Sequence, residues 1–357
     1  MHKKRMLVTY EIKKILLFVL ISLITALGIF AVLNDGVRAH YYNLYLSNTV
    51  LNMDGGCLFG DYLCLILQRL TPLGLFVFGM MALVQFSDTH NRKAREYMAS
   101  LPFTRKRRFL TKVAVGYGLI TVWSLFVCVG ALCIQKAYWP AMTKVNLLYD
   151  NFAQLMGADT YLHTIRTIGL MWLIFMAMYS VYVFTNVVIK SKVVAFINGL
   201  LLVICPFFSA NVFYGVKVSN SLFNYVWLFG HKVNETILNR YFGVLVGAGY
   251  GTEITQGETT QYYTALAYGR VGILYAIVIA ILVVTFILAF HFSHKTDAAM
   301  DASLIPSYSM KIAFSALYGW LLAIGTVFFI GSFKAIPIAI VVGIIVGILA
   351  FVLIRKR

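Results

Sequence analysis

Charge is scarce in this chain. Asp, Glu, Lys and Arg together make up 12% of its 357 residues, whereas hydrophobic types make up 61%. The mean hydropathy is correspondingly high, at +0.82. Such a composition has too few polar side chains to cover a water-soluble globule, so the sequence predicts an integral membrane protein.

Several motifs that would indicate catalysis are also missing. The sequence contains no Gly-x-x-x-x-Gly-Lys-Ser/Thr phosphate loop, so we do not expect this chain to hydrolyse nucleotide itself. It has no His-Glu-x-x-His and no Cys-x-x-Cys, and its seven histidines are scattered, so we expect neither a metal nor another cofactor on it. Acidic residues are absent from the long apolar runs, which disfavours the proton or sodium relay of an ion-coupled carrier. The chain alone is therefore not expected to be an enzyme.

Long apolar runs dominate what is present. A hydrocarbon core of about 30 Å takes roughly 20 residues of helix to cross, and eight runs are of about that length. They are residues 15–33, 63–86, 113–134, 167–189, 193–213, 271–292, 312–330 and 336–354. They lack the alternation of a membrane barrel, so the expected fold class is all-α, a polytopic membrane protein with about eight transmembrane helices.

Basic residues gather on alternate connecting segments. Residues 1–14, 87–112, 190–192, 293–311 and 355–357 hold 20 of the 30 Lys and Arg. The positive-inside rule makes these segments cytoplasmic, with both termini inside. The net charge of +17 then reflects residues at membrane edges, where they meet lipid headgroups, so nucleic acid is not an expected partner. Residues 1–14 fit either a short helix in the inner interface or a simple positive anchor.

The segment 88–112 is the densest polar passage. Four of its less polar residues recur at positions i, i+3, i+4 and i+7, as on one face of a short helix. These are Ala94, Tyr97, Met98 and Leu101. Pro102 would end this helix. A short amphipathic helix over residues 94–102 is suited to binding a protein, whereas the basic residues in 105–112 are suited to anchoring the chain at the inner interface. Composition alone also allows a basic hairpin that merely orients the spans.

Two features of the second run leave alternatives open. Arg69 either extends to the outer headgroups or faces a protein-lined cavity on a substrate path. Cys57 and Cys64 flank the outer edge of the same run, where an oxidising exterior would permit a disulfide between them. The other cysteines fall inside apolar runs and are expected to be packing residues.

The stretch Arg95-Glu96-Tyr-Met-Ala-Ser100-Leu101-Pro102-Phe-Thr-Arg105, followed by Lys112 at the start of a span, resembles the signature of ABC transporter permeases of the ABC-2 type. In that family the motif lies in the first inner loop. The family's six spans, amphipathic N-terminal helix and long outer segment resemble residues 1–292, with an inner loop at 87–112 and an outer segment at 214–270. Residues 293–357 add an inner loop and a two-helix hairpin, a layout similar to permeases of Gram-positive bacteria linked to antibiotic or peptide stress.

This resemblance implies a permease subunit of an ATP-driven exporter or flippase in a bacterial plasma membrane. Its substrate would be amphipathic: a peptide, a drug or a lipid-linked compound. Two cytoplasmic ATPase subunits, which bind ATP and Mg²⁺, and a second permease chain, identical or homologous, would complete the complex. The inner loop would form a coupling helix that contacts the ATPase through Arg92, Arg95, Glu96, Tyr97, Met98, Leu101, Pro102 and Arg105. The alternatives are an ion-coupled secondary transporter and a membrane scaffold or sensor without transport.

Overall fold

The structure is a computed structural model that describes residues 2–47, 59–91, 93–94, 96, 100, 103–147, 161–204, 270–295, 305, 308–330 and 336–356. Over these residues the backbone is almost entirely helical and contains no strand, as the all-α class predicts. The helices are α1 (His2–Lys14), α2 (Leu16–Ser47), α3 (Phe59–Gln85), α4 (Ser87–His90), α6 (Arg105–Leu147), α7 (Tyr161–Val188), α12 (Arg270–Lys295), α13 (Tyr308–Ile330) and α14 (Ile336–Lys356). A further apolar helix covers Lys192–Ile204.

Each of the eight apolar runs lies in helix over its described residues, except for the end residues Ile15, Phe86 and Ile189. Four helical segments are long and apolar enough to cross a membrane: Leu16–Arg38, Arg105–Trp139, Thr164–Val188 and Pro337–Ile354. Shorter apolar helices cover Leu73–Gln85, Lys192–Ile204 and Val278–Ser293. These long apolar helices fit a protein embedded in a membrane.

Two helices extend well beyond the predicted spans. α6 contains 43 residues, which at about 1.5 Å per residue gives a length of roughly 65 Å. The loops expected at 34–62 and 135–166 are therefore too long, because helix occupies their ends. A hydropathy scan stops at polar residues, whereas a helix continues where such residues find partners. Tyr138 Oη, for example, donates a hydrogen bond to Asn34 Oδ1 at 3.0 Å and joins the extensions of α6 and α2.

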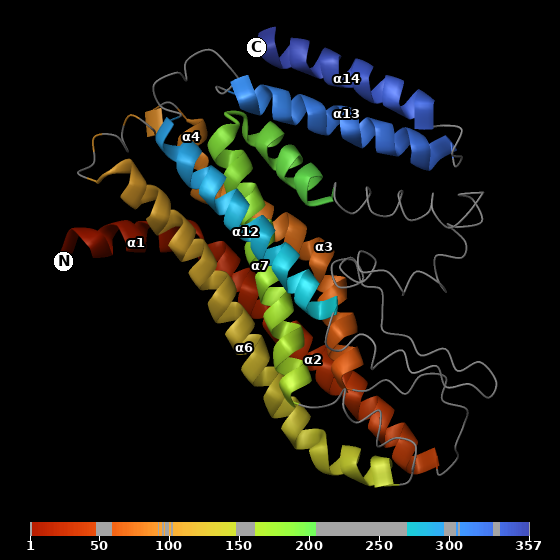
Figure 1. The fold of residues 1–357 in the computed structure, drawn as a ribbon. Helices are drawn as coiled ribbons and strands as arrows, with labels where there is room; N and C mark the ends of the chain where they lie inside the picture. Colours follow the sequence, from red (N-terminus) through yellow and green to blue (C-terminus); the bar gives the residue numbers. More distant parts are fainter. Residues whose placement is uncertain are drawn as a thin grey trace.

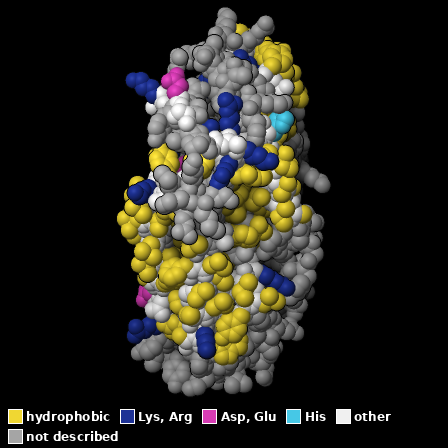
Figure 2. Space-filling view, turned by 90° about the vertical axis from the view of Figure 1, so that its left-hand side faces the viewer, with side chains coloured by type: hydrophobic (Ala, Val, Ile, Leu, Met, Phe, Trp, Pro, Cys, Tyr) yellow, Lys and Arg dark blue, Asp and Glu magenta, His cyan; other side chains and the backbone are white. Residues whose placement is uncertain are grey.

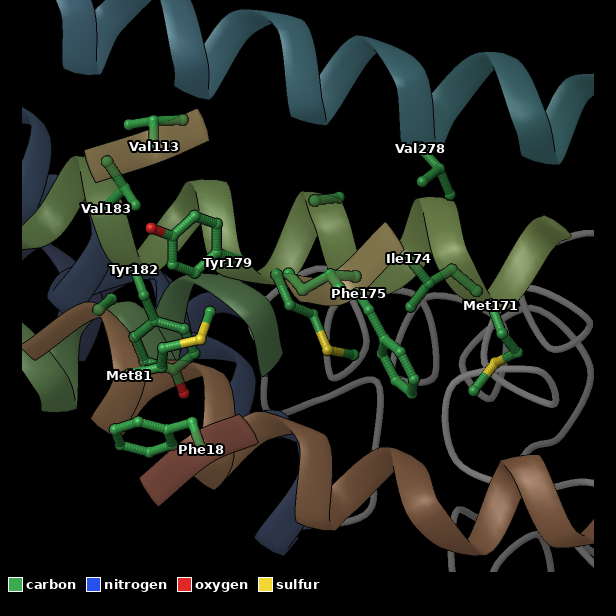
Figure 3. Packing of buried hydrophobic residues seen from close by; sticks show 14 of the residues in the cluster. Phe18, Met81, Val113, Met171, Ile174, Phe175, Tyr179, Tyr182, Val183 and Val278 are labelled. Carbon is green, nitrogen blue, oxygen red and sulfur yellow. The ribbon is translucent and has the colours of Figure 1, made fainter. Parts of the chain in front are cut away.

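Helix α7 forms the centre of the bundle. Figure 1 shows α2, α3, α6, α7 and α12 running along one another. Of the candidate span in α7, 72% is buried by protein, against 22% of the spans in α2 and α6. Figure 3 shows Met171, Ile174, Phe175 and Tyr179 spaced along α7 among its neighbours. A displacement of α7 would therefore disturb every helix packed around it.

The turn after α7 is short, as expected where only residues 190–192 separate the apolar runs 167–189 and 193–213. Helix restarts at Lys192, and the rings of Tyr182 and Phe196 stack with their centroids 5.7 Å apart across the turn. The two helices are thus antiparallel neighbours, as the sequence indicates.

The C-terminal helices α13 and α14 pack side by side (Figure 1). Two glycines allow this close approach. A Cβ atom at Gly343 would lie 2.8 Å from the Gly319 carbonyl oxygen, and one at Gly319 would overlap the Gly343 oxygen. Small residues at such crossings let membrane helices approach closely. The hairpin is tied to the bundle where Tyr318 Oη donates to Asn198 Oδ1 at 2.6 Å.

Candidate functional site at the base of the inner loop

An ion pair closes the inner loop at its base. Asp88 lies in α4, the single turn that follows α3, and Lys112 lies two turns into α6. The Lys112 ammonium donates a hydrogen bond to Asp88 Oδ1, although 24 positions separate these residues in sequence. Their side chains are only 4% and 13% exposed. The two ends of the polar segment 88–112 are thus bound to each other.

The local electrostatics favour the charged form of Asp88. Burial alone would raise the pKa of its carboxyl group, but the positive charge and hydrogen bond of Lys112 outweigh burial and hold that pKa below its ordinary value of 3.8. The Lys112 ammonium also lies 5.2 Å from the centroid of the Phe86 ring, a favourable cation–π contact. Each member of this buried pair would be left uncompensated without the other.

Lys112 is not part of an interfacial anchor, and that part of the sequence interpretation is wrong. Its position in α6 explains why. Phe109, Lys112, Val113 and Gly116 fall on one helical face, and all four are buried. Lys106, by contrast, is exposed. The run of basic residues therefore divides between two faces of α6.

Helix α1 places a second carboxylate near the Asp88–Lys112 pair. Residues 2–14 form helix α1, one of the two alternatives that the sequence allows for residues 1–14, and the Glu11 side chain is 0% exposed. Neither Glu11 carboxylate oxygen has a hydrogen-bond partner among the described residues. Burial raises the pKa of Glu11 above its ordinary value of 4.5, the positive charges of Lys112 and Lys14 oppose that shift, and the charge of Asp88 adds to it. Glu11 thus lies within electrostatic reach of the ion pair without joining it.

A buried hydrogen-bond chain connects the ion pair to α3 and α7. Gln85 Nε2 donates to the Lys112 carbonyl oxygen at 3.2 Å, and Tyr179 Oη donates to Gln85 Oε1 at 2.5 Å. Gly116 provides the space, because a Cβ atom there would overlap the Tyr179 hydroxyl group. Three helices therefore meet through one polar chain.

A further set of contacts joins α4 to the end of α7 and to the turn that follows it. His90 Nδ1 lies 2.6 Å from the Lys190 carbonyl oxygen, and Nε2 lies 2.9 Å from Asn186 Oδ1. Asn186 is oriented by its own Nδ2 group, which donates to the Tyr182 carbonyl oxygen at 2.8 Å. Both partners of the His90 ring are oxygen atoms, so the two ring nitrogens link α4 to the end of α7 and to the turn that follows it.

We call this cluster the loop base. It consists of seven residues from α1, α3, α4, α6 and α7, which are Glu11, Gln85, Asp88, His90, Lys112, Tyr179 and Asn186. The sequence interpretation missed its architecture. One signal was available: opposite charges stand at the two ends of a loop between successive antiparallel helices, where they can meet. The partners on α7 carry no such signal, because Gln, Tyr and Asn in an apolar run look like isolated polar residues.

Only part of the predicted coupling helix is described. Residues 93, 94, 96 and 100 have helical backbone, Glu96 is exposed, and Arg105 is the exposed first residue of α6. The side chains outside the described part are those of Arg92, Arg95, Tyr97, Met98, Leu101, Pro102, Cys57, Cys64 and Arg69. The backbone of Cys64 and Arg69 belongs to α3, whereas Cys57 lies wholly outside the described residues. The alternatives for Arg69 and the disulfide remain predictions.

The loop base holds its helices together through an ion pair and hydrogen bonds. Within the described ranges, no group of three or more His, Cys, Asp or Glu side chains is placed to hold a metal ion. Comparisons with protein-family models, with curated proteins and with solved structures find no match for this chain. The likeness to ABC-2 permeases therefore remains a resemblance in sequence and layout.

Proposed function

We propose that this chain is the permease subunit of an ATP-driven exporter or flippase in a bacterial plasma membrane. It would have about eight transmembrane helices and cytoplasmic termini, and it would move an amphipathic substrate. Two ATPase subunits would bind ATP and Mg²⁺, and a second permease chain, identical or homologous, would complete the complex. The proposal makes the chain a transport component rather than an enzyme.

The loop base is the observation that carries this proposal. The inner loop whose residues resemble a coupling helix is held at both ends by buried contacts. A partner that pushes on this loop must either move the helices behind it or break the Asp88–Lys112 pair. Because breaking a buried pair costs about 3–5 kcal/mol, movement of the helices is the easier response.

The contacts define two routes for such a movement. Force on the loop would reach α6 through the Asp88–Lys112 pair. It would reach α7 through His90 and Asn186, and again through Gln85 and Tyr179. Since α7 is the most buried span, its displacement would repack the bundle as a two-state, rigid-body switch. ATP binding at the partner subunits would supply the energy.

Copurification tests the proposal. The full chain is tagged and coexpressed with a candidate ABC ATPase subunit from the same genome, and the recovered ATPase is quantified. We expect the two proteins to copurify, and Glu96→Ala with Arg105→Ala to reduce recovery. Lys192→Ala is the matched control, because Lys192 is an exposed basic residue on another inner turn. Failure to copurify, or equal recovery with both sets of variants, would contradict the proposal.

One observation favours a second candidate, an ion-coupled carrier. Glu11 is a buried carboxylate with no hydrogen-bond partner among the described residues, and it lies close to the charge of Lys112. Buried ionisable groups of this kind occur in proton relays. Transport in vesicles that lack any ATPase, abolished by an uncoupler and by Glu11→Gln, would select the carrier. ATP-dependent transport that withstands the uncoupler would select the exporter.

A further inference from the structure

A groove lies along the start of α6, on the side where α1 crosses it. Its volume is about 610 Å³. Eight residues line it: Val8, Thr104, Lys106, Arg107, Leu110, Thr111, Ala114 and Val115. Its size is in the range of small-molecule sites. The loop base does not include any of these residues.

One end of the groove is positively charged. Lys106 Nζ lies 5.4 Å from the centroid of the Phe290 ring, and the Arg107 guanidinium lies 5.6 Å from that of Phe103. These aromatic contacts position the cations without neutralising them. In the described part of the chain, neither Lys106 nor Arg107 forms an ion pair with an acidic side chain. An anion is therefore the ligand that this end would favour.

The two hydroxyl groups of the groove are engaged differently. Thr111 Oγ1 donates to the Arg107 carbonyl oxygen at 2.8 Å, so its proton is used within the helix. Thr104 Oγ1 accepts a hydrogen bond from the Arg107 backbone N–H at 3.3 Å and keeps its own proton for donation. An anion at this end would therefore meet two cationic side chains and one hydroxyl donor.

The rest of the groove is apolar and points along the candidate span. Leu110 and Ala114 follow Lys106 at i+4 and i+8, so they lie on the same face of α6. Val8 of α1 adds a further apolar contact, and Val8 and Leu110 remain 39% and 38% exposed. Figure 2 shows this side of the molecule, where Lys and Arg side chains lie above a broad apolar surface and others lie near its lower end.

We propose that this groove binds one anionic phospholipid. Its phosphate contacts Lys106 and Arg107, and an acyl chain lies along Leu110, Ala114 and Val8. The geometry favours a lipid over a soluble anion, because the apolar part of the groove follows the span Arg105–Trp139 toward the hydrocarbon region. The bound lipid bridges α1 and α6, and it thereby holds the helix that carries Glu11 against the loop base.

Lipid titration followed by native mass spectrometry tests this site in the purified full chain. The probe is phosphatidylglycerol, and phosphatidylcholine is the zwitterionic comparison. We expect Lys106→Gln with Arg107→Gln to weaken binding of the first phosphatidylglycerol about thirtyfold, since each of the two basic residues near the surface contributes about 1 kcal/mol. Lys192→Gln with Lys311→Gln, which removes the same charge elsewhere, leaves that affinity unchanged.

A second variant tests the acyl contact without altering charge. Ala114→Trp fills the exposed apolar part of the groove and is expected to weaken phosphatidylglycerol binding while leaving thermal unfolding unchanged. The proposal is overturned if Ala114→Trp binds the lipid as tightly as wild type. It is also overturned if the Lys106–Arg107 double variant and the Lys192–Lys311 double variant have equal affinity for the lipid. Equal affinity for phosphatidylcholine overturns it as well. Loss of a copurified ATPase with unchanged lipid affinity would reassign the groove to a protein contact.

Discussion

The loop base and the C-terminal hairpin are held together in opposite ways. The loop base joins residues 24 to 100 positions apart through charged and polar side chains. The hairpin joins two successive helices through a close backbone approach at Gly319 and Gly343. The contacts of the loop base depend on charge and hydrogen-bond direction, whereas the contact in the hairpin depends on the small volume of the two glycines. A chemical change at the loop base should therefore spread through the bundle, whereas a change in the hairpin should stay local.

Loss of Asp88 should have the largest effect. Asp88→Ala leaves the buried Lys112 ammonium without its partner, so we expect the free energy of unfolding to fall by about 3–5 kcal/mol. Chemical unfolding of the full chain in detergent micelles measures this change. Asp88→Ala combined with Lys112→Met removes both charges and should restore most of the loss. A double variant as unstable as Asp88→Ala alone would contradict this view of the pair.

A volume change in the hairpin should cost less and act locally. Gly319→Ala introduces a methyl group onto the Gly343 carbonyl oxygen, so we expect a loss of about 1–3 kcal/mol. Hydrogen exchange should rise in α13 and α14 but not in α7. Gly325→Ala is the control, because an added Cβ there meets nothing within 4 Å. If exchange in α7 rises as much as in the hairpin, the contrast between the two regions is lost.

Two tyrosines of α7 sharpen the comparison. Tyr179→Phe leaves Gln85 Oε1 buried without its donor, so we expect a loss of about 1–2 kcal/mol in unfolding free energy. Tyr182 Oη is buried with no hydrogen-bond partner among the described residues, so Tyr182→Phe should be neutral or slightly stabilising. Thermal unfolding of the two variants side by side measures the difference. Equal losses would show that the hydrogen-bond chain contributes nothing.

The smallest effect concerns Glu11 and pH. Its raised pKa means that the folded chain holds this proton more tightly than the unfolded chain, so stability falls as pH rises from about 4.5 through the folded pKa. The contribution of Asp88 has the opposite sign. Its carboxylate stabilises the folded chain above about pH 3.8, and this stabilisation is lost as the pH falls through the lowered pKa of Asp88 in the folded chain. The free energy of unfolding of Glu11→Gln should therefore rise relative to that of wild type as the pH increases. Unfolding midpoints measured from acid to neutral pH check this, and a gap that does not change with pH would rule it out.

The sequence predicted the helices better than their ends and their contacts. Apolar runs identify the eight helical regions, and residues 190–192 correctly indicate an antiparallel pair. The runs cannot show that α6 begins at Arg105 and ends at Leu147, because those ends depend on polar partners elsewhere in the chain. Lys112 illustrates the same limit. Composition places it with its basic neighbours, and only the rotation of α6 and the position of Asp88 decide that it is buried.

The proposed function is tested most directly by ATP hydrolysis, measured in nanodiscs that contain this chain and the proposed ATPase subunit. The comparison is between wild type and Asp88→Ala combined with Lys112→Met, which lacks the ion pair but keeps Glu96 and Arg105. We expect the proposed ATPase still to copurify with this variant, while stimulation of its ATP hydrolysis by the chain falls at least about fivefold, the lower range of coupling between sites. Unchanged stimulation would show that the loop base does not carry the movement of the loop into the membrane.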